Sequence, residues 1–439
     1  MEVKKEIQIL FWIVAFFLFA FFMPIDSARF NEAIAASLDL TKWYAREHVV
    51  MCLLPAFFIA GVIAVFVSQG AVMKYFGTSA KKWLAYSIAS VSGTILAVCS
   101  CTILPLFTSI HKRGAGLGPA IAFLYSGPAI NILAIILTAR ILGFEMGIAR
   151  IIGAVVFSIV IGLTMSFIYR KEEKAKAEEQ MNFPDIPEKR PLWQTAYHFF
   201  VLVLILVFAN WGSPEEGVTS GAWYWIWFNK WYITSGLGLL FVFSLIYILK
   251  INWIYVLIAT ALTALAGFLT HSPMITMITG IAALSVITLL DKKNEDNKQW
   301  TIESWDFAKL ILPLLAVGVI IAGFLLGSNH GDTHIAGVIP NEWIATLVGG
   351  NSIFSNFFAS IVGAFMYFAT LTEVPILQGL IAAGMGKGPA LALLLAGPSL
   401  SLPNILVIRG VIGNQKTIVY VSLVVVMATI SGLIYGLLF

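Results

Sequence analysis

Two cysteines stand two residues apart inside an apolar stretch that carries no charged residue. Cys99 and Cys101 lie near the end of the run from Trp83 to Leu106. Thiolates bind soft cations and metalloids in preference to Mg or Ca. Side chains two residues apart diverge in a helix, so both thiols face one ion only in an extended or turn segment. The pair predicts a soft-ligand site, the alternative being two small thiols buried as packing.

A Pro-and-Gly pattern around these cysteines returns later in the chain. Residues 105–128 and 375–398 align without a gap at a constant offset of 270, and ten of the 24 positions are identical. Proline and glycine interrupt helices. The sequence therefore predicts a duplicated segment of broken helices.

Each copy of the pattern begins with a proline. Pro105 and Pro375 suit the first turn of a short helix, where a missing N–H costs nothing. The free amides of that turn would place partial positive charge where Cys101 and Thr372 stand. Such a field favours a thiolate, whereas apolar burial opposes it.

Each copy ends with a Gly-Pro pair inside an otherwise spanning apolar run. Gly127-Pro128 is followed by Asn131, and Gly397-Pro398 is followed by Asn404. Unwound backbone at membrane depth is tolerated only where it faces protein or a wet cavity. We interpret both interruptions as parts of a solute site; the alternative is a plain proline kink. The predicted substrate-binding residues are Cys99, Cys101, Thr102, Pro105, Gly127, Pro128, Asn131, Thr372, Pro375, Gly397, Pro398, Ser399, Ser401 and Asn404, with Cys99 and Cys101 as the metal ligands.

One acid lies within the second copy of the broken segment. Glu373 precedes Pro375 by two residues and aligns with Ile103 of the first copy. An intramembrane carboxylate is a functional candidate by default, and here it predicts a proton-coupling site. The alternative is a cap whose charge suits the helix dipole.

Composition defines the setting for these residues. Hydrophobic residues make up 59% of the 439 residues and charged residues 11%, with a mean hydropathy of +0.90. Such a chain is a polytopic membrane protein built from helices rather than a barrel. The net charge of +4 indicates no nucleic-acid partner, because basic loops at the membrane surface account for it.

Apolar runs of spanning length predict eleven transmembrane helices. They are Glu6–Met23, His48–Val67, Gly118–Arg140, Gly147–Tyr169, Thr195–Asn210, Trp231–Leu249, Trp253–Leu269, Met274–Leu290, Trp305–Leu326, Pro389–Arg409 and Thr417–Phe439. Two further segments, Lys82–Arg113 and Glu342–Lys387, each carry two short apolar stretches that meet near a proline, and we interpret them as re-entrant hairpins.

The basic loops orient this arrangement. With those loops in the cytoplasm, the N-terminus is cytoplasmic and the two hairpins enter from opposite sides. The fold class is an all-α membrane protein with two inverted repeats and helices broken at the midplane, as in secondary transporters. The predicted divisions are an N-terminal helix and outer loop (1–47), repeat 1 (48–169), a charged cytoplasmic loop (170–193), four central helices with a loop (194–304) and repeat 2 (305–439).

The same residues resemble a known family. Cys99-Ser-Cys-Thr-Ile-Leu-Pro105, Gly127-Pro-Ala-Ile-Asn131, Thr372-Glu-Val-Pro375 and Gly397-Pro-Ser-Leu-Ser-Leu-Pro403 are similar to motifs of the predicted-permease family that contains the organoarsenical efflux permeases. The resemblance implies export of trivalent organoarsenicals or other soft metal species through the cysteine motif. The efflux direction comes from this resemblance alone.

The sequence thus predicts a multi-pass inner-membrane permease that exports a thiophilic metal or metalloid species by alternating access with proton coupling. It predicts no enzyme activity and no cofactor, and the chain has no ATPase motif. The predicted partners are the lipid bilayer and a small solute. The sequence is also compatible with a homodimer. Three alternatives stay open. They are a transporter of a small anion held at half-helix N-termini, an intramembrane thiol oxidoreductase using both cysteines, and an assembly subunit.

Overall fold

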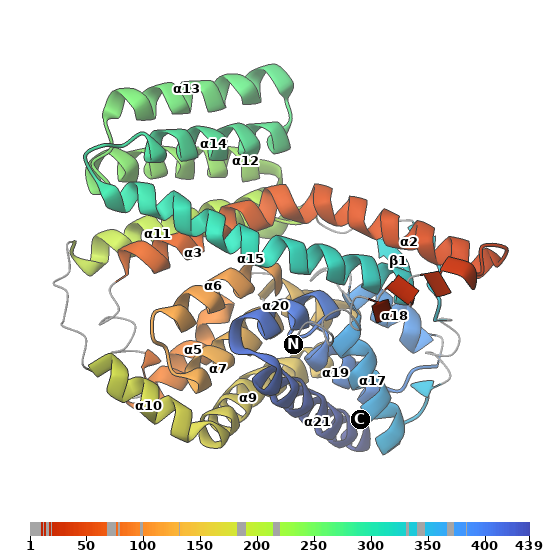
Figure 1. Cartoon of the computed structure of the whole chain (residues 1–439). Coiled ribbons are helices and arrows are strands. Elements are labelled where there is room, and N and C mark those ends of the chain that lie inside the picture. The colour runs from red at the N-terminus through yellow and green to blue at the C-terminus, as the bar shows by residue number, and fades with distance from the viewer. Residues whose placement is uncertain are drawn as a thin grey trace.

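A computed structural model shows how the predicted helices are arranged (Figure 1). It describes residues 10–11, 13–14, 17–18, 20–67, 76–77, 80–96, 100–130, 132–181, 190–213, 220–330, 333–339, 347–366, 373–382 and 384–439. Within these residues, six helices are long and apolar enough to cross a membrane, and shorter apolar helices accompany them. The protein is a multi-pass, all-α membrane protein in which the number of spans remains a prediction.

Two of the long helices lie side by side in opposite directions (Figure 1). The first is continuous from α2 (Ala28–Tyr44) through the π-helical η1 (Ala45–Leu53) to α3 (Leu54–Phe66), and the second is α15 (Glu295–Leu326). The indole of Trp300, early in α15, donates to the carbonyl of Phe58 over 2.8 Å. The hydroxyl of Ser37 in α2 donates to the carbonyl of Ile320, late in α15, also over 2.8 Å. The pair is therefore antiparallel.

Helix α2 occupies residues for which the sequence predicts an outer loop. Its charged residues dilute the hydropathy signal there, but its packing against α15 stabilises the helix. A Cβ added to Gly323 of α15 would lie 2.8 Å from the Cα of Ser37, so the two backbones approach closely. Close backbone approach at small residues is the usual means of packing helices in membranes.

Two sets of five helices share one numbering offset. The first set is α5 (Lys82–Leu96), α6 (Ser100–Lys112), α7 (Leu117–Ala129), α8 (Ile132–Ile141) and α9 (Phe144–Ile168). The second set is α17 (Ile353–Phe365), α18 (Glu373–Ala382), α19 (Lys387–Ala396), α20 (Leu402–Ile412) and α21 (Asn414–Leu438). Adding 270 to each bound of the first set gives the second within three residues, and for α9 and α21 the agreement is complete. We call these sets half 1 and half 2.

Backbone details recur at the same offset. Gly143 precedes α9 with φ +103°, and Gly413 precedes α21 with φ +82°. Residues with side chains rarely adopt such positive φ values, so glycine suits both turns. The chain can reverse sharply there, from α8 into α9 and from α20 into α21.

The last helices of the two halves run in opposite directions. Lys416, in the first turn of α21, forms an ion pair of 2.6 Å with Glu172, which follows the end of α9. The same ammonium lies 5.3 Å from the ring centroid of Tyr169, the residue directly after α9. Because α9 and α21 also pack against each other, they are antiparallel.

A pair of close glycines holds each half together. A Cβ on Gly162 of α9 would lie 2.7 Å from the carbonyl oxygen of Gly118 in α7, with Tyr86 of α5 equally near. In half 2, a Cβ on Gly388 of α19 would lie 2.6 Å from the carbonyl oxygen of Gly432 in α21. These glycines occupy the equivalent positions, so both halves use the same packing contact.

The segment between the halves contributes helices that stand apart. It contains α10 (Arg170–Met181), α11 (Leu192–Ala209), α12 (Ala222–Phe243) with the π-helical η2 (Ser244–Ile248), α13 (Trp253–Thr270) and α14 (Pro273–Leu289). Figure 1 shows α12, α13 and α14 as a separate layer, and α12 has no buried residue. After α15, the short strands β1 (Ser328–His330) and β2 (Thr333–Ile335) form an antiparallel hairpin.

Two boundaries differ from expectation. The charged segment 170–193 was expected to be a loop, but it begins with α10, whose Glu173 turns inward and accepts the N–H of Leu117 at the start of α7 over 2.7 Å. Pro105 lies inside α6 rather than in its first turn. Burial of Ile103 and Leu104 offsets the one backbone hydrogen bond that this proline removes. Pro375, in contrast, does lie in the first turn of α18.

Candidate functional site

Both apolar runs that contain a Gly-Pro pair are interrupted. In half 1, α7 ends at Ala129 and α8 begins at Ile132, with Gly127 and Pro128 in the last turn of α7. In half 2, α19 ends at Ala396 and α20 begins at Leu402. Gly397, Pro398 and Ser399 therefore lie in the break. Ser401 caps α20, because its hydroxyl accepts the N–H of Asn404 over 3.3 Å.

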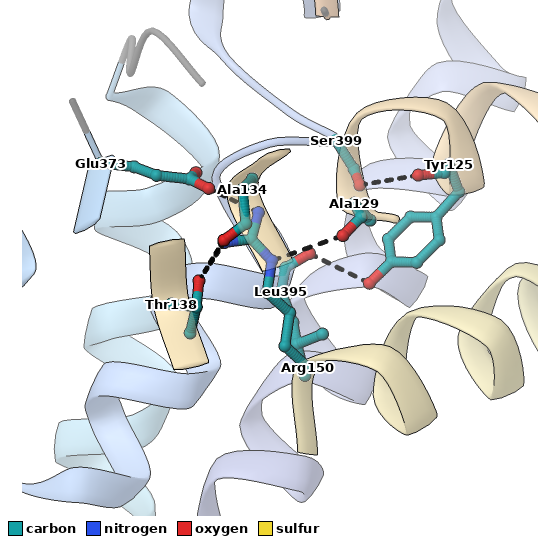
Figure 2. A network of polar contacts seen from close by, with 8 residues as sticks. All are labelled: Tyr125, Ala129, Ala134, Thr138, Arg150, Glu373, Leu395 and Ser399. Atoms are coloured by element: carbon teal, nitrogen blue, oxygen red, sulfur yellow. Dashed lines mark hydrogen bonds and ion pairs between the residues drawn. The ribbon is translucent and has the colours of Figure 1, made fainter. Parts of the chain in front are cut away.

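The two breaks meet in the interior of the protein. The phenol of Tyr125 in α7 donates to the carbonyl of Leu395 in α19 over 3.0 Å, and the hydroxyl of Ser399 donates to the carbonyl of Tyr125 over 3.1 Å (Figure 2). Leu395 is the residue 270 positions after Tyr125. Contact between equivalent residues indicates that the two halves come together at this point.

A buried arginine organises the break of half 1. Arg150 lies in the second turn of α9 and is 0% exposed. Its Nη1 donates to the hydroxyl of Thr138 in α8 over 2.9 Å, and its Nε donates to the carbonyl of Ala129 over 3.4 Å. A cation at the C-terminal end of a helix interacts favourably with the helix dipole, so Arg150 stabilises the end of α7.

The remaining donor of Arg150 connects the two halves. Its Nη2 pairs with Oε1 of Glu373 in the first turn of α18, and this carboxylate is 1% exposed (Figure 2). A buried ion pair offsets its desolvation cost only when hydrogen bonds satisfy the rest of both groups. Thr138 and Ala129 supply such bonds to Arg150. The negative charge also lies at the favourable end of α18.

The equivalent place in half 2 has no such pair. The residue of α21 that is equivalent to Arg150, 270 positions later, is the uncharged Tyr420. Its hydroxyl is buried with no hydrogen-bond partner in the part of the chain that the structure describes, and the same is true of Oδ1 of Asn404 in α20. Buried polar atoms are almost always satisfied, so each exception needs an explanation.

The sequence profile of a family described as predicted permease matches residues 34–437. The chain belongs to this family.

One relative matches most of the permease, and two others match shorter parts of it. The UPF0718 protein MJ0584 of Methanocaldococcus jannaschii is 44% identical over 395 residues, which is 90% of this chain and 93% of the relative. The UPF0718 protein YcgR of Bacillus subtilis is 24% identical over 28% of the chain and 41% of its own length. The UPF0718 protein YraQ of Escherichia coli is 26% identical over 31% and 35%. No solved structure matches the chain.

The family assignment confirms the resemblance found in the sequence. Together with the apolar helices, it establishes a multi-pass membrane protein and indicates a transporter rather than an enzyme. None of the relatives' names states a solute.

Several predicted site residues lie wholly or partly outside the described part of the chain. The backbone of Cys101 lies in the first turn of α6, and Thr102 beside it is buried. Among described residues, no group of three or more His, Cys, Asp or Glu side chains could hold a metal ion. Predicted residues outside the described part of the chain are Cys99, Asn131 and Thr372, together with the side chains of Cys101 and Pro375.

Some of the other predicted residues lie at the two breaks, and the structure adds one residue to them. Gly127, Ser399 and Asn404 are buried there, and Glu373 joins them through Arg150. Sequence reasoning missed Arg150, although a signal was present: it is a charged residue inside the apolar run Gly147–Tyr169. An ionisable residue in such a run is a functional candidate.

Proposed function

We propose that this permease is a secondary transporter that exports a thiophilic metal or metalloid species through the inner membrane by alternating access, with proton coupling. The observation that carries the proposal is the buried Arg150–Glu373 pair, which links α9 of half 1 to α18 of half 2 beside both helix breaks. Transporters place solute and coupling-ion sites at the interface of two repeats, where broken helices meet.

The proposed halves are an inverted pair, with the N-terminus in the cytoplasm. Their helices share one numbering offset, and the equivalent helices α9 and α21 are antiparallel. Opposite directions of equivalent helices are what inverted repeats require. In this arrangement the hairpin α5–α6 enters from the cytoplasmic side and the hairpin α17–α18 from the outer side.

Proton coupling would act through Glu373. Its carboxylate is charged while it pairs with Arg150, and a proton on that carboxylate removes the attraction across the interface. The two halves would then be free to move relative to each other. A conformational change needs this kind of differential interaction in the two states.

The proposed solute is held by Cys101, in the first turn of α6, and by Cys99, two residues earlier in the sequence. Thiols suit a soft ion, and the first-turn amides of α6 favour the thiolate form. Residues from both breaks would line the path beside them. These are Thr102, Gly127, Pro128, Asn131, Thr372, Gly397, Pro398, Ser399, Ser401 and Asn404.

A second candidate is transport of a small anion. The specific observation in its favour is the buried guanidinium of Arg150, because arginine binds oxyanions through several donors at once. In this mechanism, protonation of Glu373 breaks its ion pair with Arg150, and the guanidinium then binds the anion.

Flux measurements on full-length protein in liposomes test both candidates. Wild type should move trivalent arsenicals or a soft metal such as copper or zinc, and Cys99→Ser with Cys101→Ser should lose that flux. Cys52→Ser is the matched control, since Cys52 is a buried thiol of η1 and belongs to neither break. Glu373→Gln should lose the response to an imposed pH gradient.

Two outcomes would redirect the proposal. Soft-metal flux that is unchanged in the double cysteine variant rules out the thiol site. Anion flux that survives the cysteine changes but disappears in Arg150→Gln supports the second candidate instead.

A further inference from the structure

The break of half 2 differs from that of half 1 by one positive charge. In half 1 the guanidinium of Arg150 donates to Ala129 at the end of α7. The equivalent residues in half 2 are Tyr420 and Ser399. A tyrosine supplies no cation to the negative end of α19, which ends at Ala396, three residues before the equivalent of Ala129.

Two buried side-chain oxygens, one in α20 and one in α21, have no hydrogen-bond partner among the described residues. They are the phenol oxygen of Tyr420, which is 0% exposed, and Oδ1 of Asn404, which is 2% exposed. The turn at Gly413 joins α20 to α21, with Asn404 nine residues before it and Tyr420 seven residues after it. At 1.5 Å per residue, both residues lie at about the same depth relative to that turn, and α20 packs against α21.

Backbone carbonyls at the break add further oxygens. The carbonyl of Ser399 cannot receive the usual helical bond, because the residue four positions later is Pro403, which has no N–H. The N–H of Asn404 goes to the hydroxyl of Ser401 instead of the carbonyl of Leu400. No described backbone N–H donates to either carbonyl.

We propose that the break between α19 and α20 binds Na⁺ through Oδ1 of Asn404, the hydroxyl oxygen of Tyr420 and the carbonyl oxygens of Ser399 and Leu400. The site rests on these buried oxygens and does not depend on the proposed function above. The ion takes the position in half 2 that the Arg150 guanidinium takes in half 1. Unwound carbonyls and half-helix C-terminal ends coordinate Na⁺ in broken-helix transporters.

The ligand set selects the class of ion. All four oxygens are neutral, whereas Ca²⁺ and Mg²⁺ sites in proteins use carboxylates. Oxygen ligands are also unsuited to soft metals. A monovalent hard cation fits, and it is chemically distinct from the thiophilic solute proposed for Cys99 and Cys101.

Thermal unfolding of the purified full-length protein tests the site. Its midpoint should rise with NaCl and reach a plateau, relative to choline chloride at the same ionic strength, because a ligand that binds only the folded state stabilises it. Asn404→Ala and Tyr420→Phe should each lose the Na⁺-dependent rise. Asn404→Asp should keep it, since a carboxylate still ligates Na⁺. Thr429→Val is the control, being a buried hydroxyl elsewhere on α21, and it should also keep the rise.

A direct binding measurement on the wild type tests the site even if the variants fail to fold. Wild type in detergent should bind ²²Na⁺ saturably, and unlabelled Na⁺ should displace it better than K⁺. Equal midpoints in Na⁺ and choline together with non-saturable ²²Na⁺ binding would overturn the site and indicate buried water at these atoms. Neither readout involves transport, so a failure here leaves the proposed export intact, and lost export leaves a measured Na⁺ site intact.

Discussion

Arg150 and Glu373 are separated by 223 residues in the chain, yet their charged groups form an ion pair from which water is excluded. One residue belongs to half 1 and the other to half 2. Among the described ion pairs it is the only one between two buried side chains, and it crosses the interface that the proposed transport cycle would rearrange.

A double-mutant cycle should show how strongly the two charges depend on each other. Arg150→Met or Glu373→Gln alone leaves one buried charge without its partner, and we expect each to lower the free energy of unfolding by about 3–5 kcal/mol. The double variant removes both charges, so it should cost much less than the sum. Unfolding of purified protein in detergent measures all four states. Additive losses would mean that the two side chains are not coupled.

Glycine contacts within half 1 should be sensitive to a single methyl group. A Cβ on Gly162 would meet the Gly118 carbonyl oxygen at 2.7 Å and Cε1 of Tyr86 at 2.8 Å. Gly162→Ala should therefore destabilise the protein by about 1–3 kcal/mol through overpacking. Gly238→Ala is the matched control in α12, where nothing lies within 4 Å, and it should be neutral or slightly stabilising. Equal midpoints of thermal unfolding for the two variants would contradict this packing.

Two adjacent glutamates of α10 should behave differently. Glu173 is 7% exposed and accepts the first N–H of α7, so Glu173→Ala should cost about 0.5–2 kcal/mol, as other lost helix caps do. Glu172 pairs with Lys416 at the surface, with its side chain 55% exposed, and Glu172→Ala should cost at most about 1 kcal/mol. Thermal unfolding and protease cleavage within α10 compare the two. Faster cleavage in Glu172→Ala than in Glu173→Ala would be the contrary result.

Local sequence patterns were enough to locate many of the helices. The run Trp253–Leu269 predicted α13 to within one residue, because its apolar character is continuous and Asn252 accepts the N–H of Ile254 as a cap. The Gly-Pro pairs likewise marked where α7 and α19 end. Hydropathy failed for α2, since that helix depends on packing against α15, which is more than 250 residues away.

The candidate site could be predicted only in part, because it too depends on contacts between segments that are far apart in the sequence. Glu373 stands out as an acid in an apolar segment, but its partner is set by how α18 meets α9, which no local pattern records. Tyr420 gave no signal at all: a tyrosine in an apolar helix is ordinary, and only its equivalence to Arg150 and its unpartnered hydroxyl single it out.

Equivalent positions of the two halves should face opposite sides of the membrane. Glu145 and Gln415 are exposed residues in the first turns of α9 and α21, 270 positions apart. In a background with Cys52, Cys99 and Cys101 changed to Ser, each is replaced singly by Cys and exposed to a membrane-impermeant maleimide. We expect Glu145→Cys to react in right-side-out vesicles and Gln415→Cys in inside-out vesicles, because antiparallel equivalent helices begin at opposite surfaces. Detergent-permeabilised vesicles should label both variants, which controls for reactivity. Labelling of both from one side in intact vesicles would make the halves parallel and would remove the structural basis for alternating access between inverted repeats.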